Sequence, residues 1–196
     1  MKIGITGGIG SGKSYVCNII SQLGYPVYNC DKEAKRLMVN NPTIITELKN
    51  LIGKNAYTNQ NTLNKTIIAN YLFANEENAS KINKIVHPVV KQDFMQWAEK
   101  QSTEFVFMES AILFESKFDE TVDFSITICA PIEVRIQRTI KRDNTTQEQV
   151  EARINQQMSD DKRRSMADFH IDNGEGANPE KQIKQIISLL SSAKQS

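Results

Sequence analysis

The sequence lacks paired cysteines and long apolar runs. Its three cysteines, Cys17, Cys30 and Cys129, are odd in number and widely spaced, with no CxxC pair. Neither a disulfide framework nor a cysteine-rich metal or redox centre is indicated, so we expect reduced, mostly buried thiols. No apolar run approaches the roughly 20 residues that cross a bilayer, and the first residues do not resemble a secretory signal. We therefore expect a soluble, cytoplasmic protein with no membrane partner.

A large net charge of either sign is also missing. The chain has 24 Lys and Arg residues against 23 Asp and Glu residues. Such a balance produces no strong field for a nucleic acid or a membrane surface, so we expect neither partner, and an anionic ligand must meet a local basic cluster. Internal repeats are absent, and 196 residues can bury a substantial core, which favours one globular unit with lobes. Nothing in the composition indicates an oligomeric state.

A glycine-rich loop, GGIGSGKS, occupies residues 7–14, directly after the apolar stretch 3–6. The spacing satisfies GxxxxGK[ST], and apolar residues at 16, 19, 20 and 23 predict a helix after the loop. In this context backbone N–H groups hold nucleotide phosphates at a helix N-terminus. The alternative is a glycine-rich turn with an incidental lysine. We predict that a nucleotide is bound by Gly8, Ile9, Gly10, Ser11, Gly12, Lys13, Ser14 and Tyr15.

Within this loop, Lys13 and Ser14 have distinct expected roles. Lys13 is expected to reach the β- and γ-phosphates, and the hydroxyl of Ser14 is expected to hold Mg²⁺. Nucleotide binding alone does not distinguish a switch from an enzyme. A GTPase would show the guanine-reading NKxD sequence and a DxxG switch, and the sequence contains neither.

The alternation of strand and helix patterns predicts an α/β protein with three layers around a parallel sheet. Strands are expected at residues 3–6, 25–28, 105–108, 122–129 and 168–172. The stretch 31–100 is almost wholly helical, more than a crossover needs, which indicates an inserted lobe. Residues 131–164 are expected to form a charged helical hairpin that acts as a lid. The predicted nucleotide-binding core comprises residues 1–30, 101–130 and 165–196.

Two acidic residues follow predicted strands. Because ligands of doubly wound sheets bind beyond the carboxyl ends of the strands, Asp31 and Glu109 are both expected to face the phosphate loop. We predict that Asp31 accepts a proton from an attacking hydroxyl and that Glu109 helps to position Mg²⁺ through its waters. Asp31 could instead be a helix N-cap, and Glu109 could be a solvated acid at a strand end.

Arginines recur on the helix that opens at Pro131. Arg135, Arg138 and Arg142 are spaced i, i+3 and i+7, so they share one helix face. A helix of this kind supplies fixed positive charge to a phosphoryl group as it transfers, and Arg153 could point to the same place. The alternative is a solvated basic face. His87, before Pro88, could likewise be a structural residue rather than a site residue, with the proline starting a new helix.

The ordered set of motifs resembles the dephospho-CoA kinase family over essentially the whole chain. The opening, residues 5–14, matches TGGIGSGKS, which is more specific than the general phosphate loop. The other matching segments are NCD at 29–31, HP at 87–88, AILFE at 111–115, RTIKRD at 138–143, RINQQ at 153–157 and ADFHIDN at 167–173. The chain departs from the family pattern at Tyr15, Asn29, Lys65 and Ala111, where the family favours Thr, Asp, Arg and Pro.

This resemblance implies a P-loop kinase that uses ATP to phosphorylate the ribose 3′-hydroxyl of dephospho-CoA, giving CoA and ADP in the last step of CoA biosynthesis. It implies that Asp31, Lys13 and Arg142 are catalytic, with Arg138 and Arg142 contacting ATP. It also implies that residues 31–100 form a helical lobe for the CoA substrate beside the lid at 131–164, and that Asp31, His87, Lys65 and Leu113 contact the substrate. Two alternatives stay open, namely a nucleoside monophosphate or small-metabolite kinase and a regulatory module that binds ATP without using it.

Overall fold

The structure is a computed structural model that describes residues 1–58 and 62–193. Its elements, in chain order, are β1 (Lys2–Thr6), α1 (Lys13–Gln22), β2 (Val27–Asn29), α2 (Cys30–Asn40), α3 (Pro42–Ile52), η1 (Lys54–Ala56), α4 (Lys65–Ala74), α5 (Glu76–Glu99), β3 (Val106–Glu109), η2 (Phe118–Thr121), β4 (Phe124–Cys129), α6 (Ile132–Asp143), α7 (Gln147–Asn155), α8 (Asp160–Met166), β5 (Phe169–Asp172) and α9 (Pro179–Ala193).

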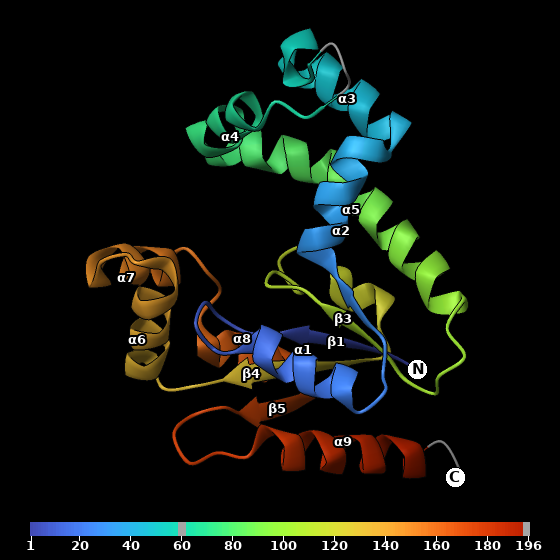
Figure 1. Ribbon diagram of the computed structural model, residues 1–196, viewed down its shortest axis with the longest axis vertical. Coiled ribbons are helices and arrows are strands. Elements are labelled where there is room, and N and C mark those ends of the chain that lie inside the picture. The colour runs from blue at the N-terminus through green and yellow to red at the C-terminus, as the bar shows by residue number, and fades with distance from the viewer. Residues whose placement is uncertain (59–61, 194–196) are drawn as a thin grey trace. The chain divides into compact units, whose positions relative to one another are not determined.

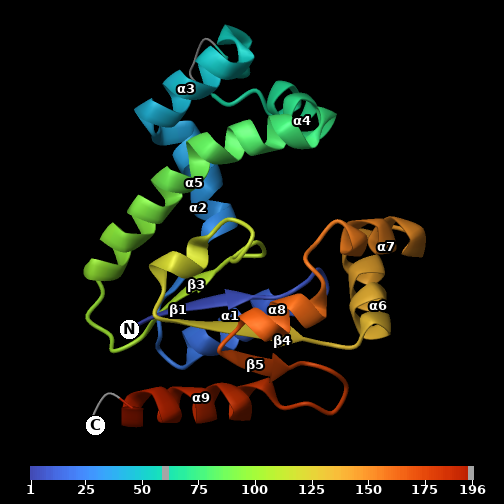
Figure 2. The same ribbon diagram turned by 180° about the vertical axis from the view of Figure 1, so that it is seen from behind.

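The chain divides into two compact units, one formed by Met1–Tyr28 with Gln101–Ser196 and the other by Asn29–Lys100. The sheet has the strand order β2-β3-β1-β4-β5, and β1 pairs in parallel with both β3 and β4, as β4 does with β5. Figure 1 shows α1 and α9 along one face of the sheet, and Figure 2 shows α8 on the opposite face. The predicted three-layer α/β fold with a parallel sheet is therefore confirmed.

The core of the first unit follows from the apolar runs that predicted its strands. Side chains of the sheet meet apolar faces of α1 and α9 in one buried cluster: Ile3, Ile5, Val16, Cys17, Ile19, Ile20, Phe105, Phe107, Ile126, Ile128, Ile171, Ile183, Ile186 and Leu190. Three of the four predicted apolar positions after the glycine loop, Val16, Ile19 and Ile20, thus lie on the buried face of α1. The fourth, Leu23, is partly buried just after the helix ends. Because β1 and α1 pack in the same cluster, the two ends of the glycine loop between them are held in place.

The second strand is shorter than its sequence predicts, because Tyr25 and Pro26 precede β2. The ring of Tyr25 packs edge-on against Phe105 and Phe107, with centroids 5.9 Å from each. The carbonyl of Pro26 accepts the backbone N–H of Phe107 at 2.9 Å. Aromatic packing of Tyr25, together with a proline that has no N–H to donate, accounts for the later start of the strand.

In the second unit, α2, α3 and α4 all pack against the long helix α5. Asn29, Asn41, Asn64 and Asn75 cap the N-termini of these four helices, each through its side-chain oxygen. Asparagine is among the best N-cap residues because it satisfies an otherwise unpaired N–H of the first turn. The interior of the unit is apolar and includes Ile44, Leu48, Ile68, Ile82, Val86, Val90 and Phe94.

Pro88 does not start a helix, contrary to one sequence interpretation. It lies inside α5, which continues from Glu76 to Glu99. A proline inside a helix removes one N–H donor to the residue four positions earlier. Both Pro88 and Lys84 are exposed, so water can reach the turn that loses this bond.

The stretch 131–164 contains three helices rather than a two-armed hairpin. α6 and α7 pack together after a left-handed turn at Asn144, where φ is 49°. Thr146 caps α7 as its sequence predicts. The third helix, α8, instead packs against β4. In the described parts of the chain, no helix combines the length and apolar character that a membrane crossing requires.

Candidate active site

The glycine loop connects β1, which ends at Thr6, to α1, which begins at Lys13. At two positions of the loop only glycine fits, because the φ angle is positive and there is no space for a Cβ atom. Gly10 and Gly12 have φ values of 75° and 94°, which other residues rarely adopt. A Cβ at Gly10 would lie 2.3 Å from the carbonyl oxygen of Arg135, and one at Gly12 would lie 2.1 Å from Nδ2 of Asn173. The loop is therefore folded tightly against α6 and against the segment after β5.

Lys13 lies across the first half of the loop. Its Nζ donates to the carbonyl oxygen of Gly7 at 2.6 Å and to that of Gly8 at 3.4 Å. The Lys13 ammonium group is thus held beside the first two residues of the loop by their carbonyl oxygens. A phosphate oxygen is a stronger acceptor for this ammonium group, because its interaction with Lys13 is charge-assisted.

Ser14 and Glu109 are brought together from two different elements. The Ser14 hydroxyl on α1 donates to Oε1 of Glu109 at 2.9 Å, and Glu109 ends β3 with only 9% of its surface exposed. Both residues supply the oxygen ligands that Mg²⁺ prefers. Within residues 1–58 and 62–193 no cluster of three or more His, Cys, Asp or Glu side chains could hold a metal. The Ser14–Glu109 pair is thus the candidate place for a cation.

The thiol of Cys17 lies beside the same carboxylate. Burial raises the pKa of Cys17 well above its ordinary value, and the negative charge of Glu109 raises it further. Cys17 is therefore a neutral thiol at physiological pH. The three cysteines lie within the described residues and form no disulfide; Cys17 and Cys30 are buried, and Cys129 is only partly buried.

The three arginines predicted on one face of α6 have different surroundings. Arg135 is buried and donates from Nε to the carbonyl oxygen of Ile9 at 2.8 Å. Arg138 is exposed, with Nη1 3.8 Å from where a Cβ on Gly12 would lie, which places it at the loop. The side chain of Arg142 is 62% exposed and pairs with Asp143, which also accepts from Arg153 at 3.1 Å. Arg135 therefore supports the loop backbone and does not share a solvated basic face with Arg142.

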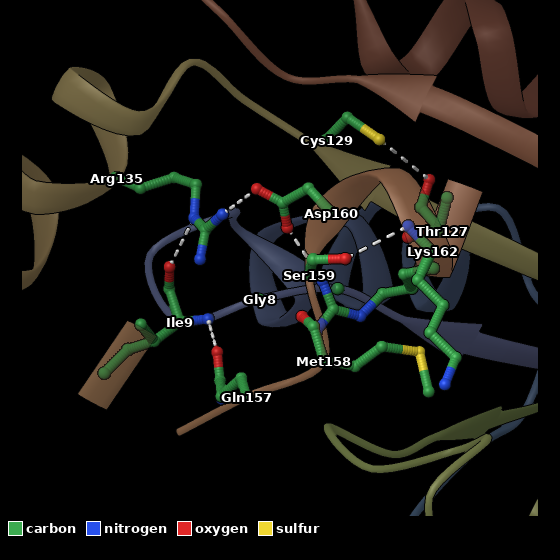
Figure 3. Close-up of polar contacts among 12 residues, drawn as sticks. Gly8, Ile9, Thr127, Cys129, Arg135, Gln157, Met158, Ser159, Asp160 and Lys162 are labelled. Atoms are coloured by element: carbon green, nitrogen blue, oxygen red, sulfur yellow. Dashed lines mark hydrogen bonds and ion pairs between the residues drawn. The ribbon is translucent and has the colours of Figure 1, made fainter. Parts of the chain in front are cut away.

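Several residues that contact the loop were not predicted as site residues. Figure 3 shows Gln157 reaching Ile9, whose N–H donates to Oε1 of Gln157 at 2.8 Å. The Asn173 amide donates to the carbonyl oxygen of Ser11 at 2.8 Å. Both residues fall in segments that matched the family, 153–157 and 167–173, so that match was the signal that could have identified them.

The predicted residues of the second unit lie on three of its helices. Asp31 is exposed in the first turn of α2, and the N-cap of that helix is Asn29, so Asp31 does not have the capping role that was its alternative. Lys65 is exposed at the first position of α4. His87 is half-buried in α5, where burial and then the charge of Lys91 lower its pKa.

Two further predicted residues belong to the first unit. Tyr15 is 56% exposed on α1, as a residue that contacts a nucleotide can be. Leu113 is fully buried, and its side chain fills the space beside Gly4, where a Cβ would lie 2.8 Å from Cδ2 of Leu113. The predicted substrate contact of Leu113 has no support from this geometry, since its side chain packs against β1.

Comparisons with known proteins address the family directly. The sequence model described as dephospho-CoA kinase matches residues 1–178. The chain belongs to the dephospho-CoA kinase family. A dephospho-CoA kinase from Bacteroides fragilis is 44% identical over 97% of this chain and 91% of the relative. The family prediction made from the motifs is therefore confirmed, and the protein is a kinase that uses a nucleotide.

Solved structures agree with this assignment. The crystal structure of TT1252 from Thermus thermophilus has a TM-score of 0.81 and 30% identity, covering 98% of this chain and 97% of that one. The dephospho-CoA kinase from Campylobacter jejuni has a TM-score of 0.71 and 25% identity, covering 99% of this chain and all of that one. Both likenesses cover nearly the whole chain, so they include residues of both units described above.

Proposed function

We propose that this protein transfers the γ-phosphate of ATP to the ribose 3′-hydroxyl of dephospho-CoA, giving CoA and ADP in the last step of CoA biosynthesis. The observation that carries the proposal is the folded phosphate loop between β1 and α1, within a chain that matches the dephospho-CoA kinase family over residues 1–178. The substrate is a small molecule, and we propose that the reaction takes place in the cytoplasm with no nucleic-acid partner.

On the donor side, backbone N–H groups of the loop at the N-terminus of α1 hold the phosphates of ATP. Lys13 exchanges its carbonyl partners at Gly7 and Gly8 for β- and γ-phosphate oxygens and stabilises the charge that develops between them. Arg138 is placed at Gly12 to add a planar donor to the phosphates. We propose the same role for Arg142, which must then exchange its bond to Asp143 for a phosphate.

The oxygens of Ser14 and Glu109 fit Mg²⁺, which favours hard oxygen ligands and keeps several of its waters. We propose that Ser14 ligates the ion directly and that Glu109 orients it through those waters. When bound, Mg²⁺ neutralises charge on the phosphate oxygens. The 2.9 Å bond between Ser14 and Glu109 supports this assignment, because it holds the two groups together.

On the acceptor side, we propose that Asp31 is the general base. Its carboxylate accepts the proton of the 3′-hydroxyl as that oxygen bonds to the γ-phosphorus, and the bond from phosphorus to the leaving oxygen of ADP breaks. Asp31 is suited to this role because it is exposed and does not cap α2. His87 and Lys65 are proposed to bind the anionic groups of dephospho-CoA, and the exposed ammonium of Lys65 supplies charge for that purpose.

The test is turnover of purified protein with ATP, Mg²⁺ and dephospho-CoA, followed by separation of the nucleotides and of CoA. We expect equal amounts of ADP and CoA, and we expect Lys13→Ala to abolish both. Lys2, in β1, offers a matched Lys→Ala control outside the loop. Absence of CoA together with rapid phosphorylation of a nucleoside monophosphate would establish the alternative kinase. ATP binding with no ADP formed from any acceptor would establish the regulatory module.

A further inference from the structure

Two polar side chains from outside the phosphate loop hold the backbone of Ile9 at both of its hydrogen-bonding groups. Gln157, in the turn after α7, accepts the Ile9 N–H at 2.8 Å. Arg135, on α6, donates from Nε to the Ile9 carbonyl oxygen, also at 2.8 Å. Figure 3 shows the two side chains approaching Ile9 from opposite sides. Gln157 and Arg135 therefore hold the Ile9 backbone although neither belongs to the GxxxxGK[ST] motif. We call these two residues the clamp.

The guanidinium of Arg135 has a fixed orientation. The side chain is only 2% exposed, and Nη1 forms an ion pair with Asp160 at the start of α8. It also lies directly against the loop, since a Cβ on Gly8 would be 2.2 Å from Nη2. A buried guanidinium requires such partners, because leaving its charge unpaired is strongly destabilising. The bond to Ile9 is thus held in place by packing as well as by the ion pair.

Asp160 is itself held by a second buried arginine. Arg163, 1% exposed, donates from Nη1 to Oδ1 of Asp160 at 2.7 Å and from Nη2 to the carbonyl oxygen of Met158 at 2.7 Å. The two arginines therefore share one carboxylate. The Asp160 carboxylate thereby joins α6 to α8 and holds the Arg135 side chain against the loop.

We expect the Gln157 and Arg135 contacts to act on the part of the loop nearest to the phosphate that is transferred. Lys13, which reaches β- and γ-phosphates in loops of this type, extends to the carbonyls of Gly7 and Gly8, directly before Ile9. The α- and β-phosphates, in contrast, are held in such loops by backbone N–H groups, and we expect those at the N-terminus of α1 to serve this purpose. Since the proposal keeps the Ile9 N–H bonded to Gln157, it assigns the contacts to the nucleotide to the other loop amides and not to the predicted N–H of Ile9.

We propose that Gln157 and Arg135 are positioning residues, which hold Ile9 so that the first half of the loop receives the γ-phosphate in the geometry required for transfer. The inference deepens the proposed function and rests on it. It predicts a selective effect, in which binding of the triphosphate and its transfer depend on the clamp, while binding of ADP does not.

The first test is Gln157→Met, which keeps the length of the side chain and removes the acceptor. We expect the affinity for a non-hydrolysable ATP analogue to fall about fivefold or more, the value of one lost hydrogen bond, with ADP affinity nearly unchanged. With dephospho-CoA, kcat should fall about tenfold or more, since small displacements of reacting groups are costly. Gln137→Met, an exposed glutamine on α6, is the matched control and should behave as the parent protein.

The second test is Arg135→Lys, which keeps the charge opposite Asp160 but loses the fixed Nε donor. It should show the same selective loss. In the double variant, the loss should be smaller than the product of the two single losses, because both residues act through Ile9. Thermal unfolding of each variant separates this signature from a general loss of fold, and either single variant suffices if the other does not fold.

Equal weakening of the ATP analogue and ADP would overturn the inference, as would unchanged affinity for both in a folded variant. Losses that simply multiply in the double variant would also contradict it. The ratio of the two affinities is measured without an acceptor. It therefore tests the clamp even if the parent protein fails to phosphorylate dephospho-CoA, an outcome that would count against the proposed function alone.

Discussion

The hydroxyl of Ser14 donates to the carboxylate of Glu109 at 2.9 Å, joining the first turn of α1 to the end of β3. Glu109 is 9% exposed, so its charge is little screened by solvent. A carboxylate in this position fixes the direction of the hydroxyl and presents its own oxygens on the same side. Among the described residues, the pair is the candidate that we propose for holding Mg²⁺.

Glu109→Gln should increase the Mg²⁺ concentration needed for half-maximal turnover. The amide can still accept from Ser14, but it has no charge with which to orient the waters of the ion. Loss of such an outer partner typically costs about 10- to 100-fold in metal affinity or activity. Initial rates over a range of Mg²⁺ at saturating ATP measure the effect, and Glu104→Gln, just before β3, is a control outside the site. An unchanged Mg²⁺ dependence would remove Glu109 from the metal site.

Asp31→Asn should reduce turnover by about 10²- to 10⁴-fold, which is the usual contribution of a general base. Affinity for ATP should remain nearly unchanged, because the proposed role of Asp31 concerns the acceptor. Asp161→Asn is a matched control, since Asp161 is likewise exposed in the first turn of a helix. Rates and ATP affinities of the three proteins provide the comparison. A comparable loss of turnover and ATP affinity in Asp31→Asn would contradict the role as base.

The phosphate loop and the sheet could be predicted from the sequence because both depend on local patterns. Apolar runs marked the strands, and the glycine spacing marked the loop. The proximity of Glu109 to the loop was also predictable, since the ends of parallel strands meet at one edge of the sheet. Its bond to Ser14 agrees with that expectation.

The contacts of Gln157 and Arg135 could not be predicted in this way. Gln157 and Ile9 are 148 residues apart, and no local pattern relates them. The spacing of Arg135, Arg138 and Arg142 predicts a shared helix face, but not which part of that face the rest of the fold covers. Arg135 is buried and pairs with Asp160, which belongs to α8, a third helix that the predicted hairpin over 131–164 did not include.

Asp160→Ala should destabilise the first unit by about 2 kcal/mol. Removing one partner of a fully buried ion pair costs about 3–5 kcal/mol, and the smaller value is expected because the Asp160 side chain is 48% exposed. Both Arg135 and Arg163 would lose their shared carboxylate. The free energy of unfolding in urea measures the effect, with Asp161→Ala expected to stay within about 0.5 kcal/mol of the parent protein. Equal stability of the two variants would show that the arginines are satisfied without Asp160.

Arg142→Lys should lower turnover by about tenfold or more, because lysine keeps the charge but loses the planar donor that a phosphate can accept from twice. Arg153→Lys is the matched control, since Arg153 pairs with the same carboxylate, Asp143. Its effect on turnover should be smaller. Steady-state rates with varied ATP distinguish the two variants, and turnover at the parent rate in Arg142→Lys would exclude a phosphate contact.

His87 should make stability dependent on pH, because burial and then the charge of Lys91 lower its pKa from 6.5. Above that value, His87 is neutral in both the folded and the unfolded chain, and the full stability is present. As the pH falls below about 6.5, the unfolded chain binds the proton first, so the free energy of unfolding decreases until the pH passes the folded pKa. Urea unfolding at about pH 7.5 and about pH 5.5 measures the decrease.

His87→Gln should make this decrease in the free energy of unfolding smaller. The same substitution at His170, the other of the two histidines and an exposed one, should leave the decrease unchanged. An equal decrease in His87→Gln and the parent protein would mean that other groups, chiefly carboxylates, account for the acid sensitivity.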